Sequence, residues 1–86
     1  MNWNSANEIL PAGNGEIYEG SLEESKLMLV YGTDPYGLHS YGLGVYIRNY
    51  EDPQENGWNG YLDQDWDLDH CKVTHWMPLP EPPKEG

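Results

Sequence analysis

The stretch that most constrains the fold is residues 39–49, H-S-Y-G-L-G-V-Y-I-R-N, in which apolar side chains recur at every second position. Successive side chains of a β-strand point to opposite faces of the sheet. We therefore predict a long strand here, with one face formed by Tyr41, Leu43, Val45 and Ile47 and the other by Gly42, Gly44, Tyr46 and Arg48. The two glycines would allow a strong twist, a bulge, or the close approach of a neighbouring element.

Other segments are predicted to pair with this strand. The apolar run 27–31 is the best candidate for a core strand, residues 58–62 and 72–77 are further strands, and residues 16–18 are a short edge strand. Ser21-Leu22-Glu23-Glu24 fits the S-x-x-E capping box, which predicts a short helix. The predicted fold class is α+β or mainly β, with a three- to four-stranded antiparallel sheet and one short helix.

The chain is predicted to form a single domain over residues 1–86, with residues 78–86 as a proline-rich polyproline II tail. A chain of 86 residues has a modest core, and one cysteine, Cys71, cannot form an internal disulfide. Seven Tyr and four Trp suit both a thin core and an interface, because these rings combine apolar area with a polar group. A thin core and exposed strand edges favour a homodimer.

The charge balance narrows the classes of partner. The chain has four basic residues (Lys and Arg together) and fifteen acidic residues (Asp and Glu together), which gives a formal net charge of −11. Such a field repels nucleic acid and anionic lipid and attracts basic protein surfaces. We therefore expect a protein partner with a basic surface, no direct binding of nucleic acid, and no binding to membranes. Residues 1–10 lack the basic start and apolar run of a signal peptide, which favours the cytoplasm.

The most unusual chemical pattern is the acidic ladder D-Q-D-W-D-L-D, with Asp63, Asp65, Asp67 and Asp69 at alternate positions. In an extended strand these carboxylates would share one face, roughly 6.6 Å apart. That spacing is comparable to the spacing of successive phosphates along an extended nucleic-acid strand, so the ladder could imitate one. The alternative interpretation is a solvated face, or an edge strand protected by its charge.

Metal and catalytic interpretations are less well supported by the residues. A calcium-binding EF-hand loop that begins at Asp63 needs Gly and Glu where the chain has Leu68 and Thr74. The spacing of His70, Cys71 and His75, with His39 as a distant fourth residue, does not match a structural zinc site. Anionic surroundings would raise the pKa of the Cys71 thiol and suppress nucleophilic catalysis. We expect no metal, no cofactor and no catalytic residue.

The C-terminal sequence V-T-H-W-M-P-L-P-E-P-P, residues 73–83, closely resembles the signature of a family of small phage and prophage proteins catalogued as domain of unknown function 551. Trp3, Leu10-Pro11, the two strand candidates at 27–31 and 41–49, and Trp58 follow the order typical of that family. The chain departs from the pattern in a long insertion over residues 13–25 and an extended acidic segment over residues 51–69. The resemblance implies phage origin and no particular chemistry.

Together these features predict a non-enzymatic phage accessory protein in the cytoplasm of the infected host cell. It would bind and inhibit a host protein, such as a CRISPR-type defence factor or another nucleic-acid-handling factor, through an acidic surface that mimics nucleic acid. One alternative is a sponge-like module that binds a small molecule in an aromatic pocket at an oligomer interface. Another is a structural or regulatory phage protein with no inhibitory role. The predicted contact residues are Glu51, Asp52, Glu55, Trp58, Tyr61, Asp63, Asp65, Trp66, Asp67 and Asp69.

Overall fold

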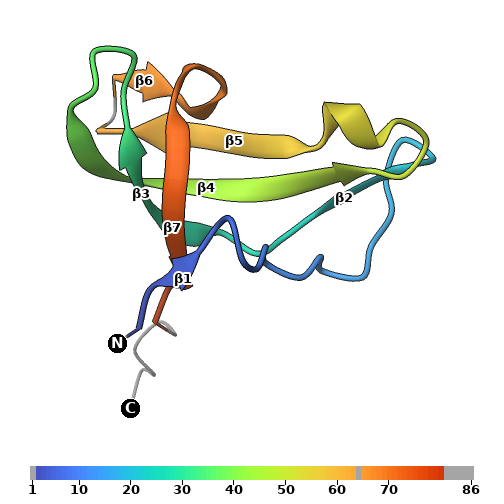
Figure 1. Ribbon diagram of the computed structural model, residues 1–86. Coiled ribbons are helices and arrows are strands. Elements are labelled where there is room, and N and C mark those ends of the chain that lie inside the picture. The colour runs from blue at the N-terminus through green and yellow to red at the C-terminus, as the bar shows by residue number, and fades with distance from the viewer. Residues whose placement is uncertain (1, 64, 81–86) are drawn as a thin grey trace.

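The predicted long strand forms the centre of a seven-stranded antiparallel sheet. The computed structural model describes residues 2–63 and 65–80. The strand order is β1 (Asn4–Ser5), β7 (Lys72–Pro78), β3 (Met28–Thr33), β4 (His39–Asn49), β5 (Gly57–Leu62) and β6 (Trp66–Asp67), and β2 (Leu22–Glu24) pairs with the C-terminal end of β4. Two short 3-10 helices, η1 (Pro53–Glu55) and η2 (Leu68–His70), lie in the connections. The sheet is strongly twisted: in Figure 1, β7 runs steeply, whereas β4 and β5 of the same sheet are nearly horizontal.

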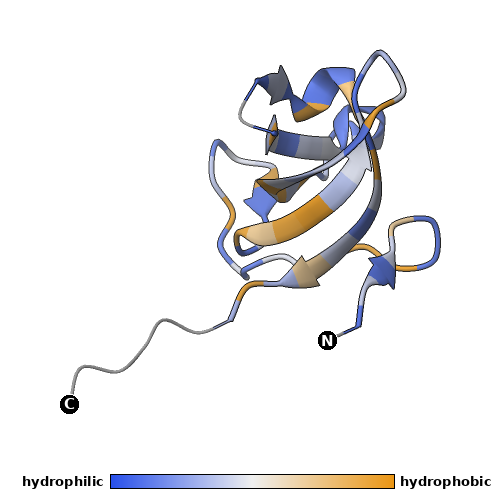
Figure 2. Ribbon diagram, turned by 90° about the vertical axis from the view of Figure 1, so that its left-hand side faces the viewer, coloured by the Kyte–Doolittle hydropathy of each residue, from blue (hydrophilic) through white to orange (hydrophobic). Residues whose placement is uncertain are grey.

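One face of this sheet, called the inner face here, carries the core. Residues that lie directly opposite each other in antiparallel strands share a face, and Val30 pairs with Trp76 on one side and with Gly42 on the other. The buried cluster contains Met28, Val30, Leu62, Leu68 and Trp76. Val30 and Leu62 are fully buried, which stabilises the fold by roughly 1.5–3 kcal/mol for each side chain. Figure 2 shows hydrophobic segments along the long strands, whereas the upper end with β5, β6 and the 3-10 helices is largely hydrophilic.

The two glycines of β4 face this core and allow close packing. A Cβ at Gly44 would lie 2.5 Å from Cδ1 of Leu68 and 2.9 Å from the carbonyl oxygen of Asn59, and a Cβ at Gly42 would collide with the backbone of Tyr61. The predicted close approach of a neighbouring element is therefore confirmed, and that element is β5 together with η2.

The predicted helix at Ser21 is wrong, and so is the predicted fold class with its three to four strands and one short helix. Leu22–Glu24 is β2, which pairs with β4 in the register Leu22–Asn49, Glu23–Arg48 and Glu24–Ile47. Because β4 extends beyond β3, its C-terminal end offers unpaired backbone groups to which β2 bonds. The fold is mainly β. The proposed edge strand over residues 16–18 is reduced to one isolated pairing between Tyr18 and Leu22.

The N-terminal segment is held against β7. Asn4 and Ser5 pair with Trp76 and His75, and Nε1 of Trp76 donates a hydrogen bond of 2.9 Å to the carbonyl oxygen of Ile9. At the other end of the chain, residues 81–86 of the predicted polyproline tail lie outside the described residues. In the part of the chain that is described, no helix has the length and apolar character needed to cross a membrane.

Candidate interaction surface

The opposite side of the sheet, called the outer face here, presents apolar and aromatic side chains to solvent. One row of directly opposed residues crosses four adjacent strands, from Met77 through Leu29 and Leu43 to Tyr61, and ends at Asp67 on β6. Tyr41, Leu43 and Tyr61 are 60%, 46% and 58% exposed. Met77 is buried, so the uncovered apolar part of the row lies on β4 and β5, where Leu43 and Tyr61 are directly opposite each other.

A cluster of rings continues this surface toward β7 and the N-terminal segment. Tyr31 packs edge-on against Tyr41 with ring centroids 4.9 Å apart, and it stacks on His39 at 5.6 Å. Trp3 lies 6.0 Å from Tyr31, 6.2 Å from Tyr41 and 6.5 Å from His75. Ring pairs at these separations stabilise one another, so the cluster forms an ordered platform.

The outer face is hollowed between β3, β4 and β5. A pocket of about 460 Å³ is lined by Leu29, Tyr41, Gly42, Leu43, Tyr61 and Asp63. Its volume lies within the range of roughly 300–1,000 Å³ that is typical of ligand sites. The lining thus combines two tyrosines and two leucines with one glycine and one aspartate.

The acidic ladder does not form a single strand. Asp63 lies in the turn after β5 with a φ of 52°, and among the described residues of the ladder only Trp66 and Asp67 are extended as β6. Asp69 belongs to η2, so the regular spacing expected of an extended ladder is absent. Asp63, Asp65, Asp67 and Asp69 are nevertheless all exposed, while Trp66 is half-buried and Leu68 is buried. The aspartates and the apolar residues between them thus alternate between solvent and the core, as predicted for this segment, but the carboxylates follow a bent path.

The other predicted contact residues fall in different places. Tyr61 lies on the outer face beside Asp63 and Asp67. Glu55, Trp58 and Asp69 come together around a smaller pocket of about 170 Å³. Trp58 also packs edge-on against Tyr46 at 5.3 Å, and Trp66 packs against the core, so both half-buried rings contribute to the core packing. Glu51 and Asp52 are exposed in the connection that follows β4.

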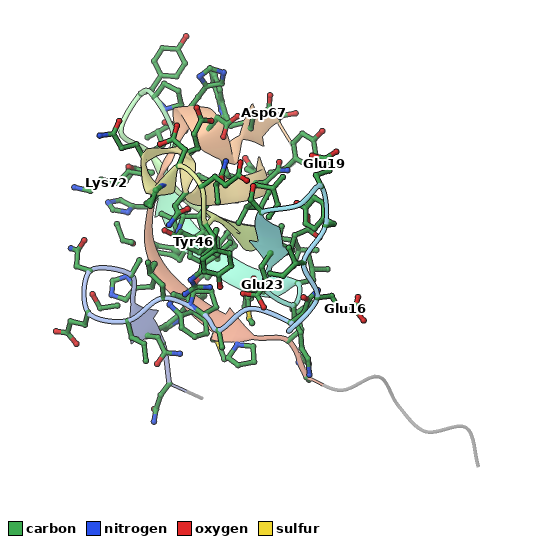
Figure 3. The ribbon with its side chains drawn as sticks, turned by 90° about the vertical axis from the view of Figure 1, so that its right-hand side faces the viewer. Glu16, Glu19, Glu23, Tyr46, Asp67 and Lys72 are labelled. Atoms are coloured by element: carbon green, nitrogen blue, oxygen red, sulfur yellow. The ribbon has the colours of Figure 1, made fainter. Side chains whose placement is uncertain are left out.

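A polar cluster at the β2 end of the sheet was not found from the sequence. The hydroxyl of Tyr50 donates a hydrogen bond of 2.5 Å to the carboxylate of Glu23, and the Gly15 N–H donates another of 2.8 Å. These two bonds, together with the charge of Arg48, hold the pKa of Glu23 below its ordinary value of 4.5, and the same bond raises the pKa of Tyr50 above 10.0. Figure 3 shows Glu23 near the middle of the molecule below Tyr46, whereas Glu16 and Glu19 lie at its periphery. Glu23 is thus placed to join the segment around Gly15 to the sheet.

Cys71 and the histidines do not form a metal centre in the part of the chain that the structure describes. No group of three or more His, Cys, Asp or Glu side chains there is arranged to hold a metal ion. Cys71 is half-buried, and burial, with the negative charges of Asp34 and Asp67, raises the pKa of its thiol. The thiolate needed for a nucleophile or a metal ligand is therefore disfavoured.

Seven residues of the outer face were not among the predicted contact residues. They are Trp3, Leu29, Tyr31, His39, Tyr41, Leu43 and His75. The sequence did place Tyr41 and Leu43 on one face of β4. An apolar face of this kind usually packs in the core, and only the pairing partners show that the glycine face is the buried one.

A family model described as "Protein of unknown function (DUF551)" matches residues 23–84, well over half of the chain. The match includes the acidic residues 51–69 and the C-terminal sequence, while Trp3 and Leu10-Pro11 lie outside it. No curated protein and no solved structure matches the chain. The chain belongs to the family of proteins of unknown function DUF551.

Proposed function

We propose that this chain is a non-enzymatic binding module that docks a basic protein partner on the outer face of its sheet. The observation that carries the proposal is the exposure of Tyr41, Leu43 and Tyr61 on adjacent strands, next to the ring cluster around Tyr31. Contiguous exposed apolar surface on a small protein is typical of an interaction site. Tyr and Trp are also the residue types most enriched among the side chains that dominate binding energy.

The charge of the molecule supports a basic protein as the occupant. Asp63 and Asp67 lie at the β5–β6 side of the outer face, and the chain carries a net charge of −11. A partner with an apolar centre and a basic rim would complement both features. Exposed aromatic rings on a sheet can also stack on nucleic-acid bases, but a phosphate backbone would meet a strongly repulsive field.

The acidic residues 63–69 have a more limited role in this proposal than the sequence suggested. Because their path is bent, these carboxylates lack the even spacing of phosphates along an extended nucleic-acid strand. The proposed function therefore does not require them to imitate a nucleic-acid backbone. As exposed carboxylates at the rim they would accelerate and orient the approach of a basic partner. The sequence resemblance to small phage and prophage proteins supports the narrower proposal of a host target, such as a defence or nucleic-acid-handling factor.

The pocket on the outer face supports a second candidate function, the storage of a small molecule. Its lining is mainly apolar and aromatic, as in many ligand sites. No Lys, Arg or His occurs among its described lining residues, and Asp63 stands at its edge, so an anionic nucleotide is a poor fit. A neutral or cationic aromatic compound would fit this candidate function.

The two candidates are separated by an affinity-capture experiment with three forms of the chain. The wild type is compared with the double variant Tyr41→Ser/Tyr61→Ser and with the control Ile9→Ser/Ile17→Ser. Ile9 and Ile17 are 55% and 54% exposed, close to the exposure of the two tyrosines, and neither lines the pocket. Bound proteins are identified by mass spectrometry at low and high salt, and near-ultraviolet circular dichroism checks that each variant is folded.

We expect one basic protein to be retained by the wild type and by the isoleucine control, and lost by the tyrosine variant. High salt should weaken its capture, because the charge attraction is screened. Equal capture by the tyrosine variant would contradict the proposed surface. A small molecule released from the denatured wild type, with no protein retained, would instead support the storage function.

A further inference from the structure

The pocket on the outer face has a composition that selects one kind of chemical group. Tyr61 and Leu43 lie directly opposite each other on β5 and β4, and Leu29 lies opposite Leu43 on β3. The N–H of Asp63 donates a hydrogen bond of 2.9 Å to the carbonyl oxygen of Tyr41, which places Asp63 and Tyr41 side by side. Two tyrosines, two leucines and one aspartate therefore line one hollow.

The backbone holds Asp63 in an uncommon conformation at this edge. Its φ of 52° lies in the left-handed region, which Asp tolerates better than most residues. The turn is fixed by the bond to Tyr41 and by a second bond of 3.3 Å from the Asp65 N–H to the carbonyl oxygen of Leu62. The backbone position of Asp63 is consequently set before any ligand arrives, which reduces the entropy lost on binding.

The charge of the lining excludes most ligand classes. The described lining residues include no cationic side chain, so an anion would find no partner and would be repelled by Asp63. A neutral apolar group would cover the Asp63 carboxylate without replacing its water, which is costly. A flat, weakly hydrated cation could stack on the tyrosine rings and at the same time neutralise the charge of the carboxylate.

We propose that this pocket binds the guanidinium group of an arginine side chain presented by the basic protein partner. Guanidinium stacks on aromatic rings and donates paired hydrogen bonds to a carboxylate, and it is more weakly hydrated than the ammonium of lysine. The inference rests on the proposed function, because the arginine belongs to the docked protein. It adds the identity of the anchoring side chain and the residues that receive it, Tyr41, Tyr61 and Asp63.

The test uses short peptides in place of the partner, so its result does not depend on finding that protein. The probes are acetyl-Gly-Arg-Gly-amide, the same peptide with lysine, and the same peptide with citrulline, which keeps the shape of arginine and lacks its charge. Methyl resonances of Leu29 and Leu43 report on occupancy of the pocket during a nuclear magnetic resonance titration of the whole chain. The variants are Asp63→Asn, Tyr61→Leu and Glu16→Gln, the last of which removes one exposed negative charge at the periphery.

We expect the arginine peptide to shift the Leu29 and Leu43 methyl resonances, the lysine peptide to bind more weakly, and the citrulline peptide to have no effect. Asp63→Asn should weaken binding of the arginine peptide by about tenfold, since a hydrogen bond to a charged group is lost. Tyr61→Leu should also weaken it, whereas Glu16→Gln should leave it unchanged.

Several results would overturn the inference. These are equal shifts with citrulline, equal weakening by Asp63→Asn and Glu16→Gln, or no shift of either leucine with the arginine peptide. The peptide test could fail while capture of a basic protein still depends on Tyr41 and Tyr61. This combination would refute the arginine pocket and leave the outer face as the interface. Peptide binding without any captured protein would refute the protein-docking function and leave the arginine site.

Discussion

At the scale of single residues, Glu23 has the clearest electrostatic role. Its side chain is only 9% exposed, yet it accepts hydrogen bonds from the Tyr50 hydroxyl and the Gly15 N–H. A carboxylate that accepts such bonds is stabilised in its charged form, which explains why the pKa of Glu23 is lowered. This cluster connects the segment before β2 to the sheet and gives the fold a dependence on pH.

The substitution Tyr50→Phe tests this connection. Because the pKa of Glu23 is lower in the folded state, the stability it contributes is fully present above its ordinary value of 4.5 and is lost as the pH falls through the folded-state pKa. Tyr50→Phe should therefore lower the melting temperature at pH 7, and its difference from the wild type should shrink at acidic pH. Thermal unfolding followed by circular dichroism measures this, with Tyr36→Phe, at a ring that is 78% exposed, as a control expected to show no change. A difference that stays constant between pH 7 and pH 3 would contradict the assigned role.

At the scale of elements, the pairing of β4 with β5 determines which side of the sheet is buried. Gly42 lies opposite Leu62, and Gly44 lies opposite Gly60, so three of these four facing positions on the inner surface carry no side chain. Leu68 of η2 occupies the space above Gly44. The apolar residues of the other side, Tyr41 and Leu43, are left on the outer face.

The substitution Gly44→Ala should destabilise the fold by about 1–3 kcal/mol, because a methyl group there would meet Leu68 and the Asn59 carbonyl oxygen. For a chain of this size, each 1 kcal/mol corresponds to a fall of about 4–8 °C in melting temperature. The control is Gly57→Ala on β5, where an added Cβ has no neighbour within 4 Å, and it should change stability little. Equal effects of the two substitutions would show that packing above Gly44 is loose.

At the scale of the whole molecule, an exposed apolar face and a large negative charge act in opposite directions on self-association. Two copies that meet through their outer faces would bury Tyr41, Leu43 and Tyr61, but each copy carries a charge of −11. The homodimer expected from the sequence remains a prediction. Its response to salt should be the reverse of the response of a complex with a basic partner.

We expect the average mass measured by analytical ultracentrifugation to rise between about 0.01 M and 1 M salt, where the screening length falls from about 30 Å to about 3 Å. The variant Tyr41→Ser/Tyr61→Ser should abolish the rise, and Ile9→Ser/Ile17→Ser should retain it. A mass that does not change with salt, or a rise that persists in the tyrosine variant, would exclude self-association through the outer face.

The sequence by itself determined the features that depend on local pattern and composition. The alternation over residues 39–49 predicted β4 with the observed bounds, and the segments 58–62 and 72–77 correspond closely to β5 and β7. Side-chain alternation is a property of the strand itself, so it can be recognised without knowledge of the partner strands. The net charge and the impossibility of an internal disulfide also follow directly from the residues.

Only the tertiary structure decided the features that depend on pairing between distant segments. Ser21–Glu24 carries a helix-start pattern, yet hydrogen bonds to the end of β4 make Leu22–Glu24 a strand. The acidic residues alternate as a strand would, yet the turn at Asp63 and the 3-10 helix at Asp69 bend their path. Tyr41 and Leu43 are exposed because Gly42 and Gly44 allow β5 and Leu68 to pack on the other side. Each outcome was set by long-range contacts that outweighed a local preference.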